Sequence, residues 1–323
     1  KARVLLYAAS PLHNPDNDVE KWKKAAAAAY DIISNPDLNY SLDSDYGAYF
    51  QGNRSLSSPE TIYVVRREQS NAMESNNYPI ATPGGASGVT PTQNLVEAYE
   101  WVGDPVAGDP YANRDPRLAA SVVTNGSTWN GHVIDQSPGG RHDMSAPNAS
   151  KTGYYLKKFL TDNLDLTQGA KVQHNWVSYR YAEVLLNYAE AMNEAYGPDQ
   201  APGDYALTAL DALQLVRDRA SLQLPIVTAA TRDEFREAVK HERRIELAFE
   251  DHRYWDLLRW KDAMEVLNKP VRGVKVTKTG EGKWSYTQTE VATRTFLERN
   301  YYMPFTRSEV ENSNHTLEQN PGY

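Results

Sequence analysis

The sequence contains no cysteine, and this absence rules out several kinds of chemistry. Disulfide bonds, a thiolate nucleophile and cysteine-ligated metal centres are all excluded. No apolar run approaches the roughly 20 residues that a membrane-spanning helix needs. Basic residues are also in the minority, because 34 Lys and Arg stand against 42 Asp and Glu, for a net charge of −8. A nucleic-acid-binding protein needs a basic face, so we expect no nucleic-acid partner.

Common catalytic motifs are missing as well. The chain has neither a glycine-rich phosphate-binding loop nor a Gly-x-Ser-x-Gly nucleophile elbow. His241-Glu242 lacks the second histidine that the helix of a zinc protease requires. No two of the 7 histidines have metal-ligand spacing on one helix; they are His13, His132, His142, His174, His241, His252 and His315. We therefore expect no metal, no cofactor and no catalytic residue.

Tyrosine and tryptophan, in contrast, are abundant. The chain has 21 Tyr and 7 Trp against only 6 Phe. These side chains combine an apolar face with a polar tip, which suits wet surfaces and sugar recognition. We expect most of them to pack at helix and loop contacts, and a few to be displayed.

The stretch from Thr231 to Leu267 predicts two short amphipathic helices. Apolar residues recur in its first part at three- and four-residue steps, which is the period of one helix face. Thr231 can cap the first helix and Asp251 the second. Charged residues crowd three turns of this stretch: Glu242, Arg243, Arg244, Glu246 and Glu250. We interpret these as a structural ion-pair network that braces neighbouring helices, in preference to a carboxylate pair for acid–base catalysis.

Several segments, in the right order along the chain, resemble the SusD/RagB family of outer-membrane nutrient-binding lipoproteins. The stretch ERRIELAFEDHRYWDLLRW, residues 242–260, is similar to the signature helix pair of that family. Residues 179–194 are similar to the preceding repeat helix, and residues 301–323, ending in Gln-Asn-Pro-Gly-Tyr, resemble the C-terminal signature. Residues 114–118 match the RDPRL element of the family.

The resemblance implies a mainly α-helical fold, in which tetratricopeptide-like helical repeats carry a long insertion of irregular loops and short strands. It implies a single SusD-like body over residues 1–323. Within it we expect a helical hairpin over 1–36, a loop-rich insertion with the ligand-binding region over 37–174, and C-terminal helical repeats with an extended tail over 175–323. A SusD-like precursor carries an export signal, a lipidated cysteine and further helices upstream. The resemblance therefore also implies that an N-terminal part is missing from this chain.

The insertion is rich in Gly, Pro, Asn and Ser, and few of its segments have a regular period. We expect short strands at 62–65, 119–124 and 153–159. Thr92 to Trp101 predicts one helix, and residues 73–88 predict a flexible loop.

Helical periodicity returns after the insertion. Apolar spacing predicts helices over 175–194 and 206–220. Residues 271–288 alternate and contain glycine, which predicts a loop or a hairpin. The tail from Met303 onward is expected to be extended.

Candidate ligand-binding residues lie in the insertion. A sugar ring has a C–H face that stacks on Trp or Tyr, and hydroxyls that pair with Asn, Asp, Gln or Arg. Tyr78, in an exposed-looking Asn-Asn-Tyr-Pro turn, and Trp129, in Thr-Trp-Asn-Gly, are the favoured platforms. Trp255 and Trp260, outside the insertion, are expected to pack within the repeats. The remaining candidates are Trp101, Tyr111, Asn77, Asn130 and Arg141.

The function that the resemblance implies is capture of an oligosaccharide at the cell surface and its delivery to a SusC-like TonB-dependent transporter, with this protein as the lid. The protein would be held at the outer membrane by a lipid on an upstream cysteine that is not in this chain. Three alternatives stay open: a peptide-binding RagB-like member, a glycoside hydrolase and a helical-repeat scaffold for protein partners. A hydrolase needs two carboxylates about 5 to 10 Å apart across a cleft. A scaffold predicts that the loop aromatics are buried.

Overall fold

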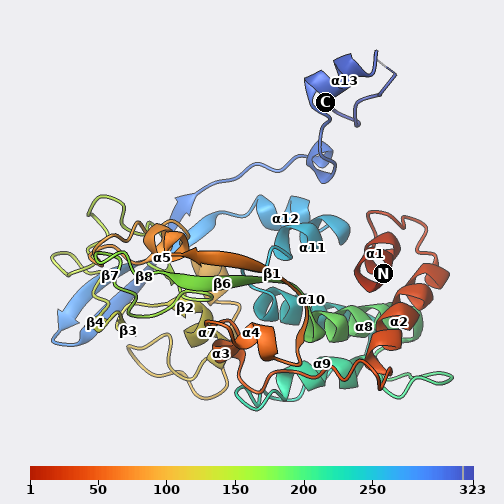
Figure 1. Ribbon diagram of the computed structural model, residues 1–323, viewed down its shortest axis with the longest axis horizontal. Helices are drawn as coiled ribbons and strands as arrows, with labels where there is room; N and C mark the ends of the chain where they lie inside the picture. The colour runs from red at the N-terminus through yellow and green to blue at the C-terminus, as the bar shows by residue number, and fades with distance from the viewer. Residues whose placement is uncertain (315) are drawn as a thin grey trace.

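The largest hydrophobic core lies between helices that come from both ends of the chain. The structure is a computed structural model that describes residues 1–314 and 316–323, so His315 lies outside the described residues. In Figure 1, the helices nearest the N-terminus lie against a long central helix. Their small buried side chains, such as Ala26 and Ala29, permit close approach. The core helices are α1 (Ala2–Ala9), α2 (Val19–Ile33), α8 (Tyr181–Tyr196), α9 (Ala209–Arg217) and α10 (Arg232–Glu246). This arrangement confirms the predicted mainly α-helical fold with tetratricopeptide-like repeats.

Capping side chains fix where these helices begin. Thr231 accepts a hydrogen bond from the Glu234 N–H, and the Glu234 side chain bonds back to Thr231, so the predicted cap of α10 is confirmed. The prediction for Asp251 is wrong. Its φ is +62°, in the left-handed region, and the next helix, α11 (Arg253–Arg259), follows His252. Asp251 takes this left-handed conformation within the tight turn after α10, so α11 begins only at Arg253. Helix α12 (Ala263–Leu267) comes next.

The charged residues at the end of α10 form the predicted ion-pair network. Glu246 is fully buried and accepts from Arg180 at 2.7 Å, Arg219 at 2.9 Å and Arg117 at 2.9 Å. Burial opposes its ionisation, but these arginine charges outweigh burial and hold the pKa of Glu246 well below its usual range. Glu250 accepts from Arg180 at 2.7 Å. The network joins α10 to the start of α8, to the end of α9 and to the insertion.

Within the described residues, the strands pair to form two-stranded antiparallel sheets. The prediction of a strand at 62–65 is confirmed, because it lies within the first of them. The predicted helix over 175–194 is wrong in its first part, because residues 172–180 pair with the first strand. Hydrogen bonding to that strand overrides the local helical period. The pairs are β1 (Thr61–Ser70) with β6 (Val172–Arg180), β2 (Val122–Val123) with β5 (Tyr155–Leu156), β3 (Thr128–Trp129) with β4 (His132–Val133), and β7 (Val271–Gly280) with β8 (Lys283–Ala292).

Short helices interrupt the insertion where loops or strands were expected. Residues 119–121 are helical because Asp115 accepts from the Arg117 N–H at 2.9 Å and Pro116 takes the first helical position. The segment 73–88 begins with a helix, and the helix after Thr92 is shorter than predicted. These helices are α3 (Tyr46–Tyr49), α4 (Arg54–Ser57), α5 (Ala72–Asn77), α6 (Gln93–Val96) and α7 (Pro116–Ser121).

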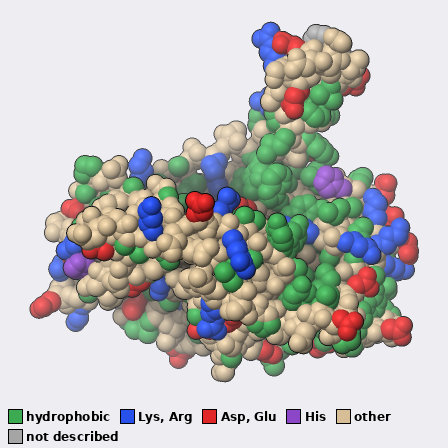
Figure 2. Space-filling view, in the orientation of Figure 1, with side chains coloured by type: hydrophobic (Ala, Val, Ile, Leu, Met, Phe, Trp, Pro, Cys, Tyr) green, Lys and Arg blue, Asp and Glu red, His purple; other side chains and the backbone are tan. Residues whose placement is uncertain are grey.

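The last part of the chain leaves the body as an arm, which Figure 1 shows at the top. It contains η1 (Glu298–Tyr301) and α13 (Arg307–Asn312), and because α13 lies beyond Met303, the expectation of an extended tail is wrong there. Thr306 and Glu309 form a capping box that starts α13, although no residue of this helix is buried. Where the arm leaves the body, Figure 2 shows a gathering of hydrophobic side chains. Among the described residues, no helix combines the length and apolarity needed to cross a bilayer.

Candidate functional site

A cleft of about 690 Å³ opens beside the tip of the β7–β8 hairpin. The loops 107–112 and 124–127 face the hairpin across it. Three aromatic rings line the cleft, from Tyr111, Trp284 and Tyr286. We call it the aromatic cleft.

Two of these rings are positioned by the hairpin. Trp284 and Tyr286 lie two residues apart on β8, so their side chains point to the same face of the hairpin. The Trp284 Nε1 donates to the Asp135 carboxylate at 3.1 Å, which fixes the indole. Gly126 lies against this indole with φ +84°, and a Cβ there would come within 3.3 Å of the ring. Glycine at this position therefore lets the loop backbone pass close to the indole.

The third ring is positioned by the loop 101–114. The Arg114 guanidinium donates to the carbonyls of Val96 at 2.8 Å and Pro110 at 3.1 Å, and so holds both sides of the loop. Asp109 accepts from the Tyr111 N–H at 2.9 Å and shapes the turn. The Tyr111 ring then meets the Tyr286 ring edge to face, with centroids 5.3 Å apart.

Polar groups lie beside the rings. The Asn125 amide donates to the Tyr286 hydroxyl at 3.3 Å, and its carbonyl oxygen accepts from the Gln136 N–H at 2.8 Å. Lys283 and Asp109 add one charge of each sign to the lining. Burial raises the pKa of both Tyr111 and Tyr286, so the phenols stay protonated at neutral pH. The cleft therefore offers ring faces together with hydroxyl, amide and charged groups.

Of the predicted ligand-binding residues, Tyr78 and Trp129 are buried. Their side chains are 0% and 3% exposed, and their rings meet edge to face with centroids 6.0 Å apart. The exposed position expected of Tyr78 is therefore wrong. Its hydroxyl donates to the Thr161 carbonyl and accepts from the Leu164 N–H, and burial raises its pKa to about 12. The two rings anchor a small loop core, in which a sugar cannot reach their faces.

The polar candidates surround the Tyr78–Trp129 pair. Asn77 is 8% exposed and bonds to the backbone of its own loop. Asn130, with φ +48°, accepts from the Asn163 N–H at 2.7 Å and lines a second, smaller pocket of about 220 Å³. Arg141 is exposed and donates to the Ala81 carbonyl at 3.1 Å. The structure thus brings these predicted residues together, while a role for them in binding stays a prediction.

Two predicted aromatics remain accessible. Trp101 is 41% exposed, and Arg114 covers one of its faces at 4.5 Å. Tyr111 lies in the aromatic cleft, on the same loop. The predictions did not include Trp284 and Tyr286. The sequence did hold a signal for them. Trp284 and Tyr286 are two residues apart in a predicted hairpin, which places both rings on one face of it.

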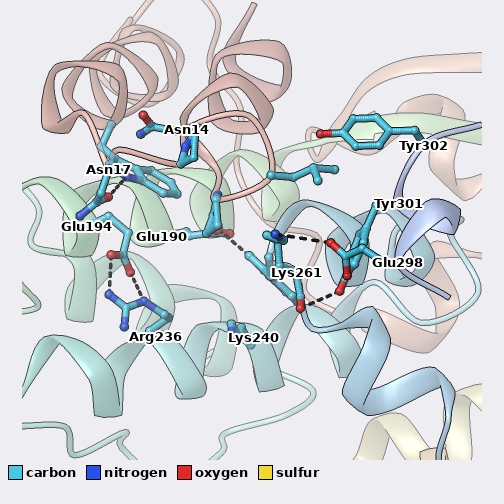
Figure 3. A pocket seen from close by; sticks show the side chains of 15 residues that line it. Asn14, Asn17, Glu190, Glu194, Arg236, Lys240, Lys261, Glu298, Tyr301 and Tyr302 are labelled. Atoms are coloured by element: carbon cyan, nitrogen blue, oxygen red, sulfur yellow. Dashed lines mark hydrogen bonds and ion pairs between the residues drawn. The ribbon is translucent and has the colours of Figure 1, made fainter. Parts of the chain in front are cut away.

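A second large cavity, of about 620 Å³, lies on the helical side and is shown in Figure 3. Many of its polar groups already bond to one another. Glu194 pairs with Arg236 at 2.6 Å, and the Tyr301 hydroxyl donates to the Lys261 carbonyl at 2.8 Å. Trp260 is 7% exposed, as expected of a packing residue, and its Nε1 donates to a carboxylate. Much of the polar lining of this cavity is therefore already engaged within the protein.

Two further observations concern residues considered above. Trp255 is 44% exposed, so the expectation that it packs within the repeats is wrong; it lies on α11 against Tyr254 instead. Within residues 1–314 and 316–323, no group of three or more His, Asp or Glu side chains is placed to hold a metal ion.

Comparison with solved structures identifies the fold. A SusD-like protein from Bacteroides fragilis superposes with a TM-score of 0.78 and 26% identity, covering 100% of this chain and 64% of that one. A SusD-like carbohydrate binding protein from the same species superposes with a TM-score of 0.77 and 27% identity, covering 96% and 62%. The fold is therefore that of the SusD-like proteins. The SusD family model matches residues 49–323, and the chain belongs to the SusD family.

Curated relatives agree with this assignment. SusD-like protein P2 of Formosa agariphila is 25% identical over 94% of this chain and 56% of its own length. SusD-like protein P38 of the same organism is 27% identical over 76% of this chain and 46% of its own length. The chain thus spans about half the length of the curated relatives it matches.

Proposed function

We propose that this protein binds an oligosaccharide and does not cleave it. The observation that carries the proposal is the aromatic cleft, where Tyr111, Trp284 and Tyr286 stand beside amide, hydroxyl and charged groups. Aromatic faces bind the C–H side of a sugar ring, and the polar groups pair with its hydroxyls. A solved relative described as a carbohydrate binding protein supports the same class of ligand.

The lining of the cleft favours binding over hydrolysis. Asp109 is the single carboxylate among its described lining residues. The usual glycosidase mechanism places two carboxylates about 5 to 10 Å apart across the cleft, one of which donates a proton to the leaving group. Asp135, which does not line the cleft, accepts a hydrogen bond from the Trp284 indole.

One observation favours the scaffold alternative, because Tyr78 and Trp129 are buried. This alternative does not account for the half-buried rings around an open cleft. We propose further that the protein acts at the cell surface, anchored to the outer membrane, and passes its ligand to a SusC-like TonB-dependent transporter as the lid. Family membership supports this role.

The direct test is calorimetric titration of a panel of oligosaccharides, with Trp284→Ala beside the parent protein. Loss of one stacking ring is expected to weaken binding about tenfold or more. Trp255→Ala is the matched control, since it removes an exposed tryptophan far from the cleft in sequence and leaves the cleft intact. Thermal unfolding of each variant reports whether the fold is retained.

Each outcome decides between the alternatives. Equal binding by the parent and Trp284→Ala removes the aromatic cleft as the site. Product sugars after incubation identify a hydrolase. Binding of peptides but of no sugar favours the RagB-like alternative.

A further inference from the structure

A groove of about 550 Å³ lies at the other end of the β7–β8 hairpin from the aromatic cleft. It is bounded by α6 and by residues of α10, α11 and α12. Its rim carries basic side chains, and Glu97 is the single acidic residue of the described lining. We call it the basic groove; its basic residues are Arg244, Arg253, Lys269, Arg272 and Arg294. Such a concentration of positive charge is unexpected in a protein with a net charge of −8.

Two of these arginines lack the partners that the other buried arginines have. The side chains of three other arginines are only 1% to 2% exposed, and each of them bonds to carboxylates: Arg117, Arg180 and Arg259. Within the described part of the chain, the Arg244 guanidinium bonds only to the Asn94 carbonyl, at 2.5 Å, and the Arg253 guanidinium makes neither an ion pair nor a hydrogen bond.

Both guanidiniums are nevertheless partly withdrawn from water. Burial lowers the pKa of Arg253 to about 10, and the like charge of Arg244 adds to the shift. Burial also lowers the pKa of Arg244. Two like charges held together at partial burial destabilise the protein unless an anion joins them. Each fork of N–H donors matches the two oxygens of a carboxylate.

The apolar lining of the groove is mostly aliphatic. It is formed by Leu95, Leu257, Val266 and Leu267, together with one aromatic ring, that of Phe249. No Trp or Tyr lies in its described lining, in contrast to the aromatic cleft. Asn94, which could serve a sugar hydroxyl, already accepts from the Arg272 N–H at 2.8 Å and donates to the Pro270 carbonyl at 3.3 Å. A mostly aliphatic lining beside carboxylate-binding donors suits a peptide better than a sugar.

We propose that the basic groove binds an extended peptide segment in which acidic side chains alternate with aliphatic ones. The aliphatic side chains lie on the apolar lining, and the carboxylates bond to Arg244 and Arg253, with Arg294 adding charge at the rim. This site is separate from the aromatic cleft and does not rest on the proposed carbohydrate binding.

The test is fluorescence anisotropy with a labelled hexapeptide of alternating Leu and Glu. A peptide of alternating Leu and Gln has the same apolar side chains without the charge, and trigalacturonate supplies carboxylates on a sugar. The Leu-Glu peptide is expected to bind, and its affinity is expected to fall about 10- to 100-fold in Arg244→Gln or Arg253→Gln. Arg66→Gln, at an exposed arginine of β1 outside the groove, is the matched control and is expected to bind as the parent does.

Two readouts separate a binding role from a structural one. If the arginines bind an anion, either glutamine variant keeps or raises the melting temperature of the unliganded protein, because the repulsion between two cations is removed. Affinity also falls as NaCl rises. A lower melting temperature in both variants overturns the proposal in favour of a role in folding. Equal binding of the Leu-Glu and Leu-Gln peptides, or arginine-dependent binding of trigalacturonate alone, overturns it as well.

Discussion

The helical part of the protein and its loop insertion are held together by different interactions. In the helical part, long-range ion pairs join the elements, as at Glu246, which bonds to arginines from the insertion, β6 and the segment after α9. The insertion also contains many short-range bonds, such as that from the Tyr111 N–H to Asp109. Small aromatic cores lie under its loops, as at Tyr78 and Trp129.

This difference explains where the candidate binding sites lie. Both the aromatic cleft and the basic groove border β7–β8, the hairpin that packs Val274 and Val276 on a core shared with α10 and the insertion. The network gives a rigid support, and loops fixed by local turns carry the side chains that face solvent. The candidate sites therefore draw on the hairpin together with loops of the insertion and the nearby helices, while the network is expected to supply much of the stability.

The largest expected loss of stability comes from Glu246→Ala in the network. The change leaves Arg180, Arg117 and Arg219 buried around a missing carboxylate, and removing one partner of a buried ion pair costs about 3–5 kcal/mol of the free energy of unfolding. Urea denaturation followed by circular dichroism measures this loss.

The control for this variant is Glu265→Ala on α12. Glu265 is 77% exposed and pairs with Lys269 at the surface, so no measurable change in unfolding is expected. Similar losses in the two variants would show that the buried network is not what stabilises the helical part.

The next prediction concerns the loop core. Trp129→Ala removes a side chain that is 3% exposed, and truncating a buried aromatic costs about 3–5 kcal/mol. Trp101→Ala, at a 41% exposed position on the neighbouring loop, is expected to cost about 1 kcal/mol or less. Urea denaturation ranks the two variants. A stable Trp129→Ala variant that has lost sugar binding would instead make Trp129 a ligand platform.

The sequence predicted the parts of the fold that depend on local pattern. The cap at Thr231 and the hairpin over 271–288 each follow from residues close together in the chain. The charged network was expected from the cluster of charges around Glu246, but its arginine partners lie far away in the sequence. The strand at 172–180 did not follow, because its pairing partner lies more than 100 residues earlier, in β1. A helical period is a weak preference that such pairing overrides.

The candidate site was less predictable for the same reason. Tyr111, one of the predicted ligand-binding residues, lines the aromatic cleft, but Trp284 and Tyr286 reach the same cleft from the far end of the chain. Tyr78 looked exposed from its Asn-Asn-Tyr-Pro turn, yet its ring is covered by Trp129. Which side of a turn faces the core is decided by packing with distant segments, and sequence spacing does not record it.

The smallest expected effect is a difference in acid sensitivity between the two regions. His142, in the insertion, is 2% exposed, and its Nδ1 accepts from the Asp135 N–H at 3.3 Å. Burial lowers its pKa to about 4, with Arg141 and His132 adding to the shift. In the helical part, burial opposes ionisation of Asp256, but Arg243 and Arg259 outweigh it and lower the pKa to about 2.

These shifts place the two losses of stability in different pH windows. The unfolded chain protonates His142 near its ordinary pKa of 6.5, whereas the folded protein resists protonation down to about 4. The free energy of unfolding therefore falls as the pH drops from 6.5 to 4, by about 3 kcal/mol at most. Asp256 stabilises the fold above its ordinary pKa of 3.8, and that contribution is lost only as the pH falls from 3.8 toward 2.

Hydrogen exchange at pH 7 and pH 5 is expected to show earlier opening in the insertion than in α10 and α11. His142→Asn, which keeps an acceptor and removes the titration, is expected to abolish the difference between the two pH values. If the helical part opens first at pH 5, then the insertion is not the acid-sensitive region, and burial of His142 does not set its stability.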